Sequence, residues 1–96
     1  MSVEELLRAK RTEILAAAAR HGASNLRIFG SLARGDADRR SDIDLLIDLE
    51  PGRSLLDHAA LAIDLNRLLG RKIDVVGARG LRPRMRERVL REAIPL

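Results

Sequence analysis

Three short apolar runs, set between helical patterns, decide most of what this chain can fold into. The runs cover residues 26–29, 42–49 and 72–76, and glycine or proline follows each of them closely. Runs of about four to eight such residues, bounded by turn residues, are typical of strands buried on one or both faces. The sequence therefore predicts three short strands.

The segments around these runs show helical spacing. Leu7, Ile14 and Ala18 predict one N-terminal helix that Ser2 and Glu5 cap and Gly22 ends. An apolar stripe predicts a second helix, with Ser54 and Asp57 as its cap and Gly70 as its stop; the stripe consists of Leu55, Ala59, Ala62, Leu65 and Leu69.

A turn over residues 77–80 and a helix over residues 84–93, entered through Pro83, complete the pattern. The order helix, strand, loop, strand, helix, strand, helix predicts an α/β (α+β) fold: a small mixed sheet of three or four strands flanked by helices. At 96 residues, we expect one domain over residues 1–96. The order of the strands in the sheet is not fixed by this pattern.

Composition removes several classes of function. The chain has no cysteine, so it holds no disulfide and no thiolate metal site. Charges interrupt residues 2–11, against a signal peptide, and no apolar run approaches the roughly 20 residues that span a membrane. We expect a cytoplasmic protein without membrane association.

The net charge of +4 is weak support for nucleic-acid binding. Sixteen of the 18 basic residues are arginine, a bias that codon composition can produce. The chain also lacks Tyr and Trp, on which single-stranded bases usually stack. Direct nucleic-acid binding is therefore not expected.

Two aspartates share one face of the second predicted strand. Side chains two apart on a strand project to the same side, about 7 Å apart at Cα, so Asp42 and Asp44 point one way and Ile43 points the other. Asp74 repeats the pattern in the third strand, between Ile73 and Val75. Alone, Asp42 would be read as a turn cap and Asp74 as a solvated edge residue.

Together the three carboxylates indicate a metal site. Like charges beside a buried strand repel one another, and a cation relieves that cost. Hard oxygen ligands favour Mg²⁺, with Mn²⁺ as the alternative. Three carboxylates on adjacent strands can hold two metals roughly 3.5–4 Å apart, as phosphoryl-transfer enzymes require.

Gly30 and Ser31 directly follow the first predicted strand. Glycine lets backbone amides approach a phosphate, and the serine hydroxyl adds a donor. Such pairs are usually only turns, but here ten residues, Arg34 and Gly35 among them, separate Ser31 from the Asp-x-Asp of residues 42–44.

In these motifs the chain resembles the DNA polymerase beta-like nucleotidyltransferase superfamily, with its palm-like fold. Within this superfamily, the sequence motifs at residues 30–35 and 41–45 are similar to those of the minimal nucleotidyltransferases, the antitoxin half of HEPN/MNT toxin–antitoxin pairs. The resemblance covers nearly the whole chain.

The resemblance implies a role for each matching residue. Asp42 and Asp44 would bind the catalytic metals, and Asp74 would complete the site and help to activate the acceptor oxygen. Gly30 and Ser31 would hold the triphosphate of ATP. Arg34 matches the nucleotide-binding pattern too, although a helix-surface or ion-pair role fits it equally well.

The resemblance also implies a biological role. Such antitoxins neutralise a HEPN-domain ribonuclease by moving AMP from ATP onto its tyrosine, with Mg²⁺, and they associate with it. This chain has no tyrosine, so a tyrosine acceptor would lie in another molecule. Inhibition of the partner by binding alone, and nucleotidyl transfer to a small molecule, remain the alternatives.

The remaining polar residues carry weaker signals. We expect surface or packing roles for His21 and His58, which have no partner at metal-ligand spacing. Asp48 shares the face of Asp44 but lies about 13 Å farther along the strand, outside the expected metal site. The arginines of residues 79–91 read as a solvated face, or as a contact for triphosphate or an acidic partner.

Overall fold

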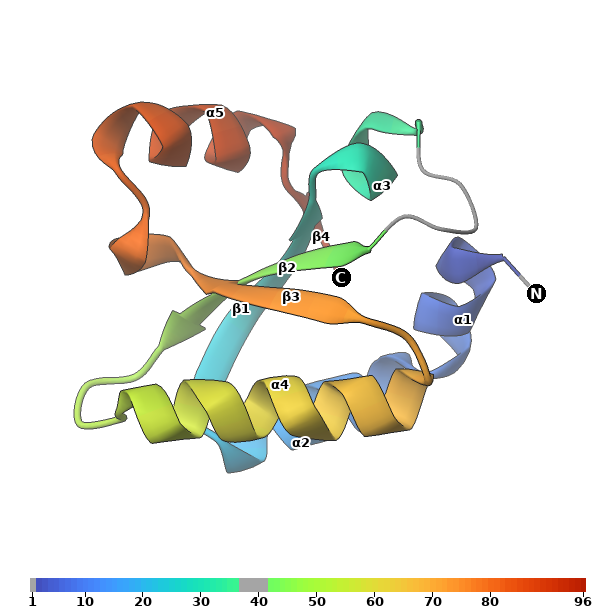
Figure 1. The fold of residues 1–96 in the computed structure, drawn as a ribbon, viewed down its shortest axis with the longest axis horizontal. Helices are drawn as coiled ribbons and strands as arrows, with labels where there is room; N and C mark the ends of the chain where they lie inside the picture. Colours follow the sequence, from blue (N-terminus) through green and yellow to red (C-terminus); the bar gives the residue numbers. More distant parts are fainter. Residues whose placement is uncertain (1, 37–41) are drawn as a thin grey trace.

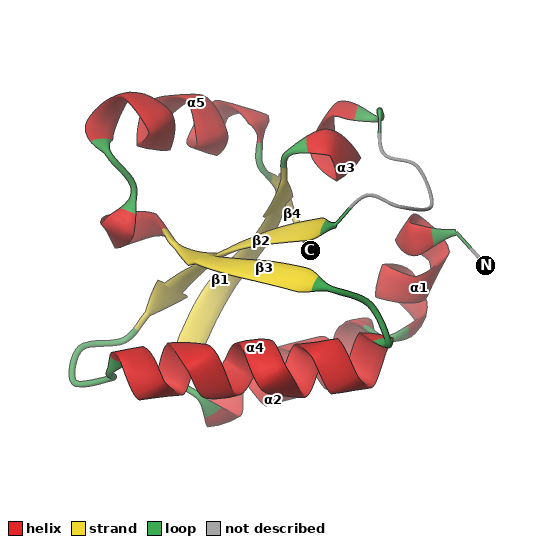
Figure 2. Ribbon diagram, in the orientation of Figure 1, coloured by secondary structure: helices red, strands yellow, loops and turns green. Residues whose placement is uncertain are grey.

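A four-stranded mixed sheet forms the centre of the computed structural model, which describes residues 2–36 and 42–96 (Figures 1 and 2). Its strands lie in the order β3-β2-β1-β4. β1 is antiparallel to both neighbours, and β2 is parallel to β3. The strands are β1 (Ala23–Phe29), β2 (Ile43–Leu49), β3 (Ile73–Gly77) and β4 (Ile94–Pro95).

Helices cover both faces of this sheet, as the α/β prediction requires. They are α1 (Val3–Ala9), α2 (Arg11–Arg20), α3 (Ser31–Arg34), α4 (Leu55–Leu69) and α5 (Pro83–Glu92). Figure 1 shows α2 and α4 side by side below the sheet and α5 above it. Among these described helices, none combines the length and the apolar character that a bilayer crossing needs.

The alternating side chains of β2 distinguish the two faces of the sheet. Ile43, Leu45 and Ile47 are at most 1% exposed and belong to the main core with α2 and α4. Asp44 and Leu46 point to the opposite face, where Leu46 packs with Val89 of α5 in a second, smaller cluster. The acidic face of β2 is therefore the face that α5 covers.

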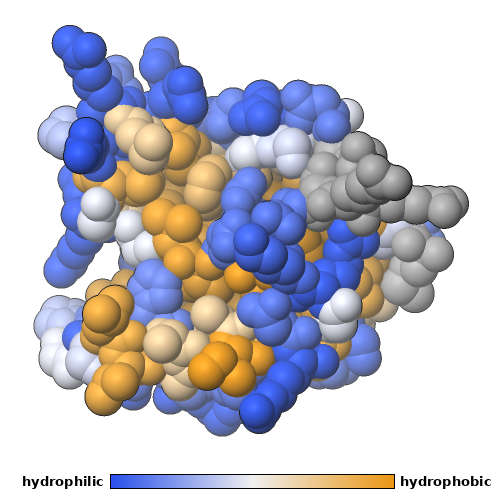
Figure 3. Space-filling model, in the orientation of Figure 1, coloured by the Kyte–Doolittle hydropathy of each residue, from blue (hydrophilic) through white to orange (hydrophobic). Residues whose placement is uncertain are grey.

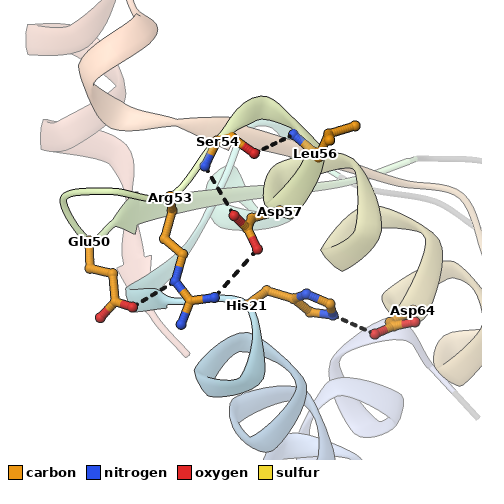
Figure 4. A network of polar contacts seen from close by, with 7 residues as sticks. All are labelled: His21, Glu50, Arg53, Ser54, Leu56, Asp57 and Asp64. Carbon is orange, nitrogen blue, oxygen red and sulfur yellow. Dashed lines mark hydrogen bonds and ion pairs between the residues drawn. The ribbon is translucent and has the colours of Figure 1, made fainter.

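The capping predicted for α4 is confirmed. The Ser54 side chain accepts from a backbone N–H of the first turn, Asp57 accepts from the Ser54 N–H, and Gly70 ends the helix with φ +63°. Figure 4 shows how polar contacts extend this cap: Arg53 bridges Glu50 and Asp57, at 2.7 and 3.4 Å. The turn between β2 and α4 is thereby held.

Both histidines pack between elements, in agreement with the sequence analysis. His21 Nε2 lies 2.7 Å from Asp64 Oδ2 and links the end of α2 to α4. His58 Nε2 lies 2.6 Å from the Val75 carbonyl oxygen, to which it must donate. Because β3 is an edge strand, this contact satisfies part of an otherwise unpaired backbone edge.

The single N-terminal helix predicted from residues 2–22 is wrong. The chain breaks at Lys10, whose φ of −101° and ψ of 7° separate α1 from α2. Helical spacing gives no sign of the break, because Leu7 and Ile14 are both buried in the main core on either side of it. Ser2 does cap α1, accepting from the Glu5 N–H.

Other boundaries differ on a smaller scale. The loop predicted between the first two strands begins with the short helix α3, and the turn predicted over residues 77–80 contains a 3₁₀ helix, Ala78–Gly80. Asp42 lies one residue before β2 rather than within it. β4, which pairs with β1, supplies the fourth strand that the prediction left open.

Candidate active site

Two of the three predicted aspartates face each other across the parallel strands. Asp44 of β2 is the direct register partner of Asp74 of β3, and neighbouring strands lie about 4.8 Å apart. Both side chains project to the α5 face because Ile43 and Ile73 beside them are buried in the main core. The structure therefore places these two carboxylates opposite each other on adjacent strands.

Gly30 closes the site on the side of β1. Phe29, the residue before it, is the register partner of Asp44. A Cβ at Gly30 would overlap the Asp44 Oδ2 atom, so the carboxylate lies directly against the glycine Cα. Gly30 also has φ +74° and ψ −149°, a backbone conformation that essentially only glycine adopts. This requirement is one that the sequence motif alone does not reveal.

Asp42 lies beside this pair but is engaged elsewhere. Its Oδ2 is 3.5 Å from Lys72 Nζ, in an exposed contact at the start of β3. Exposed ion pairs of this kind contribute about 0–1 kcal/mol, so the contact is easily exchanged. Sequence reasoning missed Lys72, although a basic residue directly before Ile73-Asp74 was a visible signal.

The donor set suits a magnesium site that forms together with its substrate. In the parts of the chain that the structure describes, no three His, Cys, Asp or Glu side chains are grouped closely enough to hold a metal ion. Mg²⁺ is commonly held by one or two carboxylates plus substrate phosphates and water. Asp44 and Asp74 meet that requirement, and Asp42 would join them by leaving Lys72.

The electrostatics of Asp44 point the same way. Its pKa is raised above the ordinary value, first by burial and then by the negative charges of Asp74 and Asp42, while Arg34 opposes the shift. A carboxylate in this environment is costly to keep ionised. A cation between Asp44 and Asp74 would remove that cost.

This shift predicts a pH dependence for the metal-free protein. Because the pKa of Asp44 is higher in the folded state, its contribution to stability is full below the ordinary value of 3.8 and is lost as pH rises through the folded pKa. With a chelator present, we expect Asp44→Asn to be more stable than the wild type at neutral pH, with an advantage that shrinks on acidification. Urea unfolding of both proteins, at neutral and at acidic pH, measures the difference in their free energies of unfolding. An Asp44→Asn variant that is less stable than the wild type at neutral pH would contradict this explanation.

Ser31 and Arg34 lie on α3, the single turn of helix that follows Gly30. Ser31 is its first residue and is partly exposed. The Arg34 guanidinium contacts Asp36 at 3.4 Å and Glu92 of α5 at 3.2 Å, and these carboxylates raise its pKa. The ion-pair role considered for Arg34 is thus present, and it ties α3 to the end of α5.

Asp48 lies outside the site. It pairs in register with Ser24, at the far end of β1 from Phe29. Its carboxylate accepts from Arg27 Nη2 at 2.9 Å and from Asn25 Nδ2 at 3.0 Å. This side chain has a structural partner and serves as a reference for the aspartates of the site.

This chain is similar to several known proteins. Residues 12–96 match the nucleotidyltransferase domain family. The chain is 36% identical over 92 residues to the protein adenylyltransferase MntA of Thermococcus cleftensis, covering 96% of this chain and 90% of that protein. It is also 35% identical over 94 residues to MJ0435 of Methanocaldococcus jannaschii, named provisionally as a protein adenylyltransferase, covering 98% and 97% of the two chains.

Solved structures show the same fold. A protein described provisionally as a minimal nucleotidyltransferase is 59% identical and superposes with a TM-score of 0.87, covering 96% of this chain and 94% of that one. A toxin–antitoxin complex crystallised with AMP-PNP contains a chain that superposes with a TM-score of 0.74 at 21% identity, covering 88% of this chain and 69% of that one. At that identity the second likeness concerns the fold alone.

Proposed function

This chain belongs to the nucleotidyltransferase domain family, and on that premise we propose that it is a protein adenylyltransferase and antitoxin that moves AMP from ATP onto a partner protein. The observation that carries the proposal is the pairing of Asp44 with Asp74 across β2 and β3, with Gly30 against the Asp44 carboxylate. The names of two relatives, each matched over nearly its full length, support the choice of a protein as acceptor.

Each residue has a part in the proposed transfer. The backbone at Gly30 and the hydroxyl of Ser31 hold the phosphates of ATP, next to Asp44. The hydroxyl oxygen of the acceptor attacks the α-phosphorus of ATP and forms a bond to it, while Asp74 accepts the hydroxyl proton. The bond between the α-phosphorus and the oxygen of the departing pyrophosphate breaks. Mg²⁺ held by Asp42, Asp44 and Asp74 would supply positive charge to the phosphates and to the leaving group.

The acceptor is proposed to be a tyrosine of a HEPN-domain ribonuclease toxin. The sequence resemblance to HEPN/MNT antitoxins supports this choice. The 96 residues of this chain contain no tyrosine of their own. Transfer must then take place between two molecules. The small size of the domain agrees with this, because the partner itself can supply binding surface next to the site.

The test is a labelling experiment with the protein encoded beside this chain. With ATP labelled at the α-phosphate and Mg²⁺, we expect label on that protein, and with ATP labelled at the γ-phosphate we expect none. Tyr→Phe variants of the partner should each be tested, and one of them should lose the label. Label from the γ-phosphate would indicate a kinase, whereas equal toxin inhibition with and without ATP would indicate neutralisation by binding alone.

A further inference from the structure

The net positive charge of this protein lies in one segment. Residues 78–93, which form the 3₁₀ turn and α5, contain six arginines and two glutamates, a net charge of +4. That equals the net charge of the whole chain, because the other residues carry twelve charges of each sign. The segment of residues 78–93 is therefore strongly basic, and the charges of the rest of the chain balance.

Two charged side chains of this segment make contacts that hold α5 against neighbouring elements. Arg86 donates to the carbonyl oxygens of Ala78 and Arg79, at 3.1 and 3.0 Å, and holds the 3₁₀ turn against α5. Glu92 accepts from Arg34 of α3. These contacts fix the orientation of α5, so its remaining arginines are presented in a defined way.

Three other arginines of α5 form a separate group, which we call the basic stripe: Arg84, Arg88 and Arg91. They are spaced by four and three residues, so they share one exposed side of the helix, away from the buried Val89. Within the described part of the chain, none of the three guanidinium groups meets a hydrogen-bond or ion-pair partner. Figure 3 shows hydrophilic side chains projecting from the edge of the molecule that α5 occupies in Figure 1.

The basic stripe leads toward the candidate active site. Arg84, Arg88 and Glu92 are four residues apart and follow one side of α5. Glu92, at the end of that row, contacts Arg34, three residues after Ser31. A molecule bound along the stripe would therefore extend to α3, which begins at the predicted phosphate-binding residue Ser31.

The neighbours of the stripe favour a protein over a nucleic acid. Met85 and Leu90 are 49% and 43% exposed on the same helix, and Arg and Met are both enriched in protein interfaces. The one aromatic residue, Phe29, is partly buried against the small core cluster under α5, so the stripe itself has no aromatic side chain on which a base could stack.

We propose that the basic stripe of α5, with Met85 and Leu90 beside it, docks an acidic surface of the protein that receives AMP. This inference rests on the proposed function and adds the recognition element for its substrate. Complementary charge raises the rate of encounter and sets the orientation of the partner. The acceptor hydroxyl would then be delivered next to Asp74.

Binding of a fluorescent random copolymer of glutamate and tyrosine tests this without any catalytic step. We expect the variant R84E/R88E/R91E to bind it at least about tenfold more weakly than the wild type, and R84Q/R88Q/R91Q to fall between them. The matched control is R8E/R20E/R67E, which makes the same charge change at exposed arginines of α1, α2 and α4. It should bind nearly as the wild type does.

The outcomes separate the possible explanations. Equal weakening in the control would show diffuse attraction and overturn the docking site, as would tighter, stripe-dependent binding of a single-stranded RNA of matched charge. Asp44→Asn should bind the copolymer normally. If the wild type binds through the stripe but transfers no AMP to any acceptor, the proposed function fails while the docking surface stands.

Discussion

Asp44→Asn should lower AMP transfer by about three orders of magnitude or more. The change removes a carboxylate that faces Asp74 in register and that, in the proposed mechanism, holds the cation against the phosphates. Charge stabilisation by a bound metal amounts to several kcal/mol in the transition state, and about 4 kcal/mol corresponds to a thousandfold in rate. Transfer of α-phosphate label to the partner protein, followed at saturating ATP, measures the loss.

Asp48→Asn is the matched control for this variant. Asp48 lies on the same face of the same strand, yet it contacts Arg27 and Asn25 rather than the site. Its replacement should leave the transfer rate within a few fold of the wild type. If the two variants lose activity equally, the assignment of Asp44 to the site is wrong.

Gly30→Ala should lower both stability and activity. Any side chain at Gly30 faces a φ of +74° with a ψ of −149°, and strain of this kind costs about 1–3 kcal/mol. For a domain of this size each kcal/mol lowers Tm by about 4–8 °C. The new Cβ would also displace the Asp44 carboxylate, and a displacement of about 1 Å can cost a hundredfold in rate.

Gly35→Ala separates backbone strain from displacement of the carboxylate. Gly35 has φ +80°, and apart from its chain neighbours no atom of residues 2–36 and 42–96 lies within 4 Å of the position that its Cβ would take. Alanine there should lower Tm through strain of about 1–2 kcal/mol while activity stays near the wild-type level. Thermal unfolding and label transfer are measured on both variants; equal losses of activity would contradict a special role for the contact between Gly30 and Asp44.

Local patterns in the sequence predicted the parts of the site that depend on single strands. Alternation along β2 placed Asp44 opposite Ile43, and the glycine after β1 marked the turn at Gly30. The capping residues of α4 were equally readable, because a cap involves residues only three apart. These features need no knowledge of the rest of the fold.

Features that depend on how elements meet could not be predicted in this way. The register of Asp44 with Asp74 depends on how α4, which connects β2 to β3, packs against the sheet. The contact of Asp42 with Lys72 depends on that register. β4 is only two residues long, too short a segment to be predicted from its own sequence, and it is defined by its pairing with β1. In each case the deciding contact joins distant parts of the chain.

The most direct test of the account is a crystal structure with Mn²⁺ and a non-hydrolysable ATP analogue. We expect an anomalous peak between the carboxylates of Asp44 and Asp74, Asp42 turned from Lys72 toward the metal, and the analogue's phosphates beside Gly30 and Ser31. A peak at some other place, with Asp44 and Asp74 free of metal and the analogue bound elsewhere, would contradict the account.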